Sequence, residues 1–135
     1  MKLIIPGEPT GKARPRVTKQ GIAYTPKKTV NYETLVQEIY AIEHGNKRLE
    51  GEITARITAY FSIPKSASKK KKADMLSGQI RPTKKPDGDN LAKIILDSLN
   101  SIAYKDDSQV VELTVSKYYG DSPRVEVELI ETMAS

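Results

Sequence analysis

The sequence contains no cysteine and only one histidine among its 135 residues. Without cysteine, the chain cannot form disulfides, use a thiolate nucleophile, or hold zinc or an iron–sulfur cluster through sulfur. With a single histidine, it also lacks the two- and three-histidine ligand sets of zinc hydrolases. Any bound metal must therefore be held mainly by oxygen atoms, which favours Mg²⁺, Mn²⁺ or Ca²⁺.

Long apolar runs are missing as well. No stretch approaches the roughly 18 consecutive apolar residues of a membrane-spanning helix, and the apolar run in MKLIIPGEP is too short for a signal peptide. We therefore expect no membrane partner and a cytoplasmic location. Because there is no tryptophan and one phenylalanine, isoleucine, leucine and valine must supply most of the core. The length suits one domain spanning residues 1–135.

Acidic residues are fewer than basic ones. The chain has 22 lysines and arginines against 17 aspartates and glutamates, which gives a net charge of +5 and an isoelectric point near 9.3. This balance fits a polyanionic partner, although many basic proteins bind no polyanion. The longest basic run, Lys69 to Lys72, is typical of a solvated helix face.

Short strands and helices alternate along the chain. We expect strands at Lys2–Pro6, Ile22–Thr25, Glu52–Ile63, Val110–Tyr119 and Val125–Ile130. Helices are expected from Pro26 to near Gly45, over Ser66–Ser77 and over Asp89–Ser101. The apolar stripe expected on the first helix comprises Leu35, Val36, Ile39, Tyr40 and Ile42. This order predicts an α+β fold, a single domain in which helices pack on a mixed β-sheet.

The stretch KPDGDNLAKIILDSLNSIAYKDDSQV, residues 85–110, carries the most distinctive chemistry. On a helix that begins at Asp89, with about 100° between successive residues, Lys93 and Asp97 fall on the same side as Asp89. The polar side also takes Asn90 and Asn100. The other side is apolar and should pack on the sheet; it comprises Leu91, Ile94, Ile95, Leu99 and Ile102.

Asp87 precedes Asp89 by two residues, at the expected helix start. Unpaired N–H groups and the helix dipole favour carboxylates there, and Gly88 lets the backbone turn tightly between them. One interpretation is purely structural: either aspartate caps the helix, and Lys93 is the ion-pair partner of Asp89 one turn later.

A second acidic pair, Asp106–Asp107, favours a different interpretation. It follows the short apolar segment Ile102–Tyr104. If that segment pairs in the sheet beside the helix start, Asp107 reaches Asp87 and Asp89. Three carboxylates around one point need a divalent cation.

Hydrolysis of a phosphodiester suits such a site. Mg²⁺ lowers the pKa of bound water and stabilises charge on the phosphoryl and leaving oxygens. Lys93, one turn into the helix, would stabilise charge in the transition state or orient the attacking water.

KPDGDNLAKIILDSLN followed by AYKDDSQV closely resembles the motif of RusA-type Holliday junction resolvases. The segments PTGKARPRVTKQGIAYTPKKTVNYE and IPKSASKKKKADMLSG are similar to the same family, so the resemblance covers most of the chain. It implies a homodimeric endonuclease that depends on Mg²⁺, with Mn²⁺ as the alternative, and that places paired symmetric nicks across a four-way DNA junction. Members of the family often reside in phages and prophages.

The resemblance also implies roles for individual residues. The family's acidic site uses the two aspartates of its PDxDN segment, the lysine four residues after the second, and the second aspartate of the later pair. The catalytic residues would then be Asp87, Asp89, Lys93 and Asp107, and the metal ligands Asp87, Asp89 and Asp107. Asp97 and Asp106 match acidic family positions to which we assign no role. Gly88 departs from the pattern, because a larger apolar residue is expected there; this would loosen the geometry without removing a ligand.

Some basic residues lie directly beside the acidic stretch, and others lie far from it in the sequence. Because a nuclease site repels DNA, nearby cations are needed to hold phosphates. The expected DNA-binding residues are Lys12, Arg14, Arg16, Lys84 and Lys85. Arg14 is the leading N-terminal candidate because its RPR segment matches the family pattern, while Lys84 and Lys85 are equally consistent with a solvated loop.

Two other functions stay open. In a non-catalytic DNA-binding module, the acidic cluster would be only a cap and ion-pair network, and added metal would produce no cleavage. In a Ca²⁺-binding structural protein, oxygen ligands would hold the ion, but the spacing does not match the alternating ligands and final glutamate of an EF-hand loop.

Overall fold

The computed structural model describes residues 1–132, so the last three residues of the predicted domain lie outside the described part. The main sheet has the order β1-β6-β4-β5. Its strands are β1 (Lys2–Pro6), β4 (Ile53–Ser62), β5 (Val110–Gly120) and β6 (Arg124–Glu131). β6 pairs antiparallel with β1 and β4, whereas β4 and β5 are parallel. The predicted mixed sheet is confirmed.

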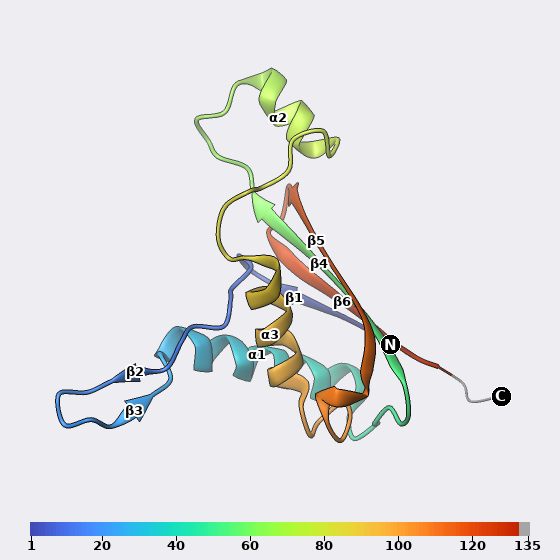
Figure 1. Cartoon of the computed structure of the whole chain (residues 1–135). Coiled ribbons are helices and arrows are strands. Elements are labelled where there is room, and N and C mark those ends of the chain that lie inside the picture. Colours follow the sequence, from blue (N-terminus) through green and yellow to red (C-terminus); the bar gives the residue numbers. More distant parts are fainter. Residues whose placement is uncertain (133–135) are drawn as a thin grey trace.

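Two helices lie against one face of this sheet, as Figure 1 shows. They are α1 (Lys27–His44) and α3 (Gly88–Leu99). The other elements are β2 (Arg16–Val17), β3 (Ala23–Tyr24), α2 (Lys69–Leu76) and the 3-10 turn η1 (Asp107–Gln109). The α+β class predicted from the order of the segments is therefore confirmed. Within residues 1–132, no helix has the length and apolar content needed to span a membrane.

The core lies between the sheet and the two helices. Strand β4 alternates as predicted, and its inward-facing side chains are buried: Ile53, Ala55, Ile57, Ala59 and Phe61. From α3, the predicted apolar side is also buried: Leu91, Ile94, Ile95 and Leu99. Burial of these aliphatic side chains fixes the rotation of α3 and turns its polar side outward.

The apolar stripe predicted for α1 is partly wrong. Val36 and Tyr40 are buried, but Ile42 is 81% exposed. The buried stripe instead begins at Thr29 and Tyr32 and continues through Val36 and Tyr40, at intervals of three and four residues. Since Ile42 follows Tyr40 by two residues, it points to the opposite side of the helix.

Residues 14–25 form a hairpin that we call the arm, and it extends away from the helices and the main sheet (Figure 1). The sequence predicted one strand here, Ile22–Thr25; the structure has two, and β2 was not predicted. The turn is closed by the N–H of Gly21, which donates to the Thr18 carbonyl at 2.9 Å. Gly21 has a φ of +81°, which glycine adopts without strain.

The connection after α3 differs from the expectation. Ile102–Tyr104 does not pair in the main sheet; it turns under the C-terminal end of α3. The Ala103 N–H donates to the Leu99 carbonyl at 2.9 Å, and the Tyr104 hydroxyl donates to the Leu96 carbonyl at 2.6 Å. Capping these last carbonyls holds the segment at the helix end, so Asp107 begins η1 there and not beside the helix start.

Candidate functional site

The start of α3 presents two carboxylates. Asp87 occupies the N-cap position with φ −69° and ψ 158°, but its side chain makes no capping hydrogen bond. Asp89 lies exposed in the first turn, and Lys93 lies exposed one turn later. Among residues 1–132, the ion pairs found do not include one between Asp89 and Lys93. The cap-and-ion-pair interpretation is therefore not what the structure shows.

Gly88, between the two aspartates, is the first residue of α3. Its φ is not positive, so the predicted tight turn that only glycine could make is not present there. A Cβ atom added there would lie 3.8 Å from Cγ1 of Val115, which is an ordinary van der Waals contact. The position thus has room for a side chain, and the glycine is not required by packing.

A hollow of about 400 Å³ adjoins this helix start. It lies between the base of the arm, the start of α1 and the residues that lead into α3, and its lining includes Asn90, the neighbour of Asp89. Its cationic lining residues are Lys12, Arg16, Lys28 and Lys85. Three of these were predicted to bind DNA, whereas Lys28 was not predicted.

Gly11 sets how closely the N-terminal loop approaches α3. A Cβ atom at this position would lie 2.7 Å from Cβ of Pro86, which is closer than real contacts allow, and 3.1 Å from Cβ of Asn90, which is tighter than most real contacts. The next N–H, of Lys12, donates to the Asn90 carbonyl at 3.1 Å. Sequence reasoning missed Gly11, since a glycine in a loop rich in proline and cations carries no distinct signal.

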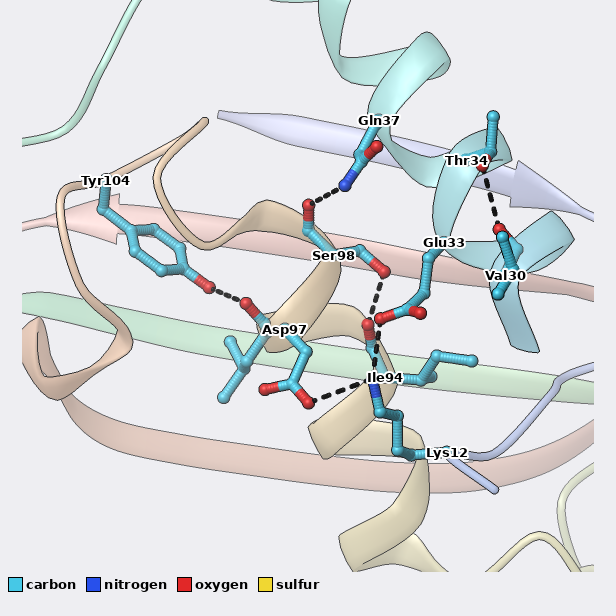
Figure 2. A network of polar contacts seen from close by, with 10 residues as sticks. Lys12, Val30, Glu33, Thr34, Gln37, Ile94, Asp97, Ser98 and Tyr104 are labelled. Carbon is cyan, nitrogen blue, oxygen red and sulfur yellow. Dashed lines mark hydrogen bonds and ion pairs between the residues drawn. The ribbon is translucent and has the colours of Figure 1, made fainter. Parts of the chain in front are cut away.

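Lys12 ties the loop to both helices, as Figure 2 shows. Its Nζ lies 2.9 Å from Oε2 of Glu33 on α1 and 3.4 Å from Oδ2 of Asp97 on α3. Burial lowers the pKa of Lys12, but the hydrogen bonds and charges of the two carboxylates outweigh this and raise it. The ammonium is therefore already balanced by protein carboxylates, and its predicted contact with DNA stays a prediction.

Lys84 and Arg14 lie outside this hollow. The Lys84 ammonium lies 5.8 Å from the ring centre of Phe61 and 5.9 Å from that of Tyr119, which are cation–π distances. Its carbonyl accepts a hydrogen bond from the Lys117 ammonium at 2.5 Å. Arg14 is exposed at the base of the arm. Binding of DNA by either residue stays a prediction.

Asp107 lies at the opposite end of α3. Its N–H donates to Oδ1 of Asn100 at 3.2 Å, and burial together with the neighbouring charges of Asp106 and Asp97 raises its pKa. The helix has twelve residues, which is about 18 Å of length. Within residues 1–132, no three acidic, histidine or cysteine side chains gather closely enough to hold one metal ion. A single chain therefore does not bring Asp107 to Asp87 and Asp89.

The two carboxylates at the helix start still suit a magnesium ion. Mg²⁺ is usually bound through one or two carboxylates, keeps several waters and takes further oxygens from a phosphate. Asp87 and Asp89 are exposed, and within residues 1–132 their side chains make no hydrogen bond or ion pair that would compete with a metal ion. The donor set is all oxygen, as the absence of cysteine requires.

The fold and the site together define a class: a small α+β domain with paired carboxylates at a helix start beside a cationic hollow, which is chemistry suited to phosphodiesters. Comparison with known families agrees. The family model of endodeoxyribonuclease RusA matches residues 6–130, and the chain belongs to that family, which acts on Holliday junction DNA. The resemblance inferred from the acidic motif is thereby confirmed. Over 139 aligned residues, the chain is also 39% identical to the uncharacterized protein YqaN of Bacillus subtilis (strain 168), covering 99% of this chain and 98% of that protein.

Proposed function

We propose that this protein is a Mg²⁺-dependent endonuclease that resolves four-way DNA junctions by paired symmetric nicks, as a homodimer in recombination and repair. The observation that carries the proposal is the start of α3. Asp87 and Asp89 lie there, directly beside a hollow lined by lysine and arginine, and in the described part of the chain neither makes a capping hydrogen bond or an ion pair. Membership of the RusA family supports the same activity in general.

Divalent cations supply an activated water and charge stabilisation for hydrolysis of the phosphodiester. Asp87 and Asp89 would hold the ion with their carboxylate oxygens. Lys93 lies one turn further along the exposed side of α3, where an ammonium can stabilise negative charge that develops on a phosphoryl oxygen. The cations of the hollow, Arg16, Lys28 and Lys85, would hold the flanking phosphates.

Dimerisation would account for the distance of Asp107. The length of α3, about 18 Å, lies between Asp107 and the pair Asp87 and Asp89. A two-fold axis that places two copies of α3 antiparallel would bring Asp107 of one copy near Asp87 and Asp89 of the other. Strand β5 offers a surface for this contact. It is the edge of the sheet beside α3, and Val111 and Leu113 on it are 56% and 45% exposed. Two sites related by two-fold symmetry match a junction that needs two opposed cuts.

The proposal is tested by cleavage of a four-way junction and of linear duplex with the same sequence, with Mg²⁺ or with EDTA. We expect metal-dependent cleavage of the junction, which Asp87→Asn and Asp89→Asn abolish because the isosteric amide lacks the required charge. Thermal melting should show that both variants fold. Lys93→Ala should reduce single-turnover cleavage in Mg²⁺ far more than binding in Ca²⁺. Cleavage by Asp87→Asn at the wild-type rate would refute the metal site.

A cruciform plasmid separates paired from independent cuts. Paired cuts linearise the plasmid, whereas independent cuts first accumulate the nicked circle. We expect linear product, and sedimentation at about twice the monomer mass of 15.0 kDa. A monomer that yields only nicked circles would refute the resolvase while leaving a metal-dependent nuclease.

A non-catalytic DNA-binding module is the second candidate. The separation of Asp107 from Asp87 and Asp89 favours it, since three carboxylates are not gathered within one described chain. Such a module would keep its affinity for DNA in EDTA and cleave nothing with Mg²⁺ or Mn²⁺. The cleavage assay above decides between the two.

A further inference from the structure

The arm is unusual in its exposure. All residues from Arg14 to Thr25 are exposed except Thr18, which is half-buried. Among them are three large apolar side chains: Val17 is 66% exposed, Ile22 64% and Tyr24 47%. A hairpin whose strands have two residues each has no core of its own, and isolated hairpins are at best marginally stable in water. Its shape and composition therefore need an explanation outside the folding of the domain.

Charge identifies the kind of partner. Between Glu8 and Glu33 the chain has no acidic residue, and the arm lies in the middle of this segment. The segment carries six cations. Lys12 is paired with Glu33 and Asp97, and the other five are Arg14, Arg16, Lys19, Lys27 and Lys28. A surface that carries cations and no carboxylate is complementary to a polyanion and repels a positively charged partner. DNA phosphates fit it better than a second copy of this basic chain.

Phosphates do not explain the apolar side chains. Arg16 pairs directly with Tyr24 across the hairpin, so the two side chains share a face. Ile22 lies opposite Thr18, whose N–H donates to the Ile22 carbonyl at 2.9 Å, and alternation puts Ile22 on the same face as Tyr24. One face of the arm thus combines a guanidinium, a phenol ring and an aliphatic side chain. That combination suits a contact with both the backbone and the flat faces of bases.

The arm begins at the candidate site. Arg16 lines the same hollow as Asn90, Pro86 and Lys85, which adjoin the two carboxylates at the start of α3. DNA held in the hollow would therefore meet the face that carries Arg16 and Tyr24. In an intact duplex, the faces of the bases are covered by stacking and are out of reach. They become available where the stack is interrupted, as at the centre of a branched molecule, and apolar side chains can enter there.

We propose that the arm inserts its Ile22–Tyr24 face at the branch point of junction DNA, against unstacked bases, while its cations bind the adjoining phosphates. The arm would then supply the preference for branched DNA, and the site at α3 the hydrolysis. This inference rests on the proposed function, because it assumes that junction DNA occupies the hollow.

The test uses the double variant Ile22→Ser with Tyr24→Ser, which keeps every cation. Ile42→Ser is the matched control, since Ile42 is 81% exposed on α1 and lies outside the arm and the site. Affinity is measured by fluorescence anisotropy in Ca²⁺ for a four-way junction and for linear duplex of the same sequence. A junction with 2-aminopurine at the branch reports unstacking through increased fluorescence. Thermal melting and sedimentation of each variant accompany the binding measurements.

We expect the arm variant to lose at least about fivefold in affinity for the junction, to keep its affinity for duplex, and to lose the 2-aminopurine signal. The control should match the wild type in all three. An arm variant that keeps junction affinity and fluorescence, or that loses junction and duplex affinity equally, would overturn the inference. So would sedimentation at half the wild-type mass, which would make the arm an interface between copies.

Failure of the arm is distinguishable from failure of the proposed function. Cleavage of the junction by the wild type in Mg²⁺ tests the function alone. If the wild type cleaves and the arm variant behaves like the control, only the inference about the arm is wrong. If the wild type neither binds nor cleaves the junction, both are wrong.

Discussion

Gly11 and Gly88 both lie at the start of α3, yet an added methyl group should have opposite effects on stability at the two positions. In Gly11→Ala, the new Cβ would lie 2.7 Å from Cβ of Pro86, a ring atom that cannot rotate away. The loop must then move, and the hydrogen bond from the Lys12 N–H to the Asn90 carbonyl, 3.1 Å long, is strained or lost. In Gly88→Ala, the nearest atom is 3.8 Å away, which requires no movement.

The magnitudes follow from these contacts. Overpacking costs about 1–3 kcal/mol, and replacing glycine by alanine returns about 0.4–1 kcal/mol through the unfolded chain. We expect Gly11→Ala to lose about 1–2 kcal/mol of stability. In a chain of this size, that lowers Tm by about 3–10 °C. Gly88→Ala should equal or slightly exceed the wild type, because alanine favours the helix.

Thermal and urea unfolding of the two variants measure this directly, and anisotropy with junction DNA shows whether displacement of the loop weakens binding. Equal Tm values for Gly11→Ala and the wild type would refute the steric argument. A large loss of stability in Gly88→Ala would instead show that the backbone next to Asp87 does not tolerate a side chain at position 88, even though there is space for one.

Two further predictions concern charges. In Lys12→Met, Glu33 and Asp97 lose their shared cation, and since the ammonium is partly screened by solvent we expect a loss of about 1 kcal/mol. The pKa of Lys12 is raised in the folded state, so its contribution should be complete below its ordinary pKa of 10.5 and disappear as the pH rises through the folded value; equal urea midpoints for the variant and the wild type at pH 7 would refute this. In Asp107→Asn, Tm in EDTA at pH 7 should hold or rise, because the raised pKa of Asp107 means that its ionised form costs stability. This difference should vanish at a pH below 3.8, its ordinary pKa, where the carboxyl is protonated in both states; a lower Tm at pH 7 would show that the carboxylate stabilises the fold.

Periodic segments of the fold could be predicted from the sequence because the spacing of their apolar residues indicates which side is buried. Strand β4 alternates with period two and α3 has one apolar side, so their type and orientation follow from local pattern. For the same reason, the exposed positions of Asp89 and Lys93 were foreseen. The prediction that Ile42 is buried was wrong because α1 is weakly amphipathic, so its sequence does not define its buried side. Packing against α3 and β1 buries Thr29 and Tyr32 and leaves Ile42 exposed.

Features that leave no periodic pattern in the sequence could not be predicted. Strand β2 has only two residues, and its pairing with β3 is defined by a turn at Thr18–Gly21. The position of Asp107 depends on Tyr104, whose hydroxyl binds a carbonyl at the end of α3, and a short apolar run does not reveal whether it joins a sheet or caps a helix. Gly11 matters only because Pro86, 75 residues later, lies against it (86 − 11 = 75).

The anchoring of the N-terminal loop at Gly11 and Lys12 has a consequence for how the family can diversify. Both anchors precede the arm, and the chain re-enters the body of the protein at Pro26 and Thr29, the latter buried at the start of α1. Everything between these points contributes no side chain to the core. The arm can therefore change in length or sequence without any compensating change in the domain. Exchange of residues 14–25 between relatives would be a route by which one hydrolytic scaffold acquires a different preference among branched DNA structures.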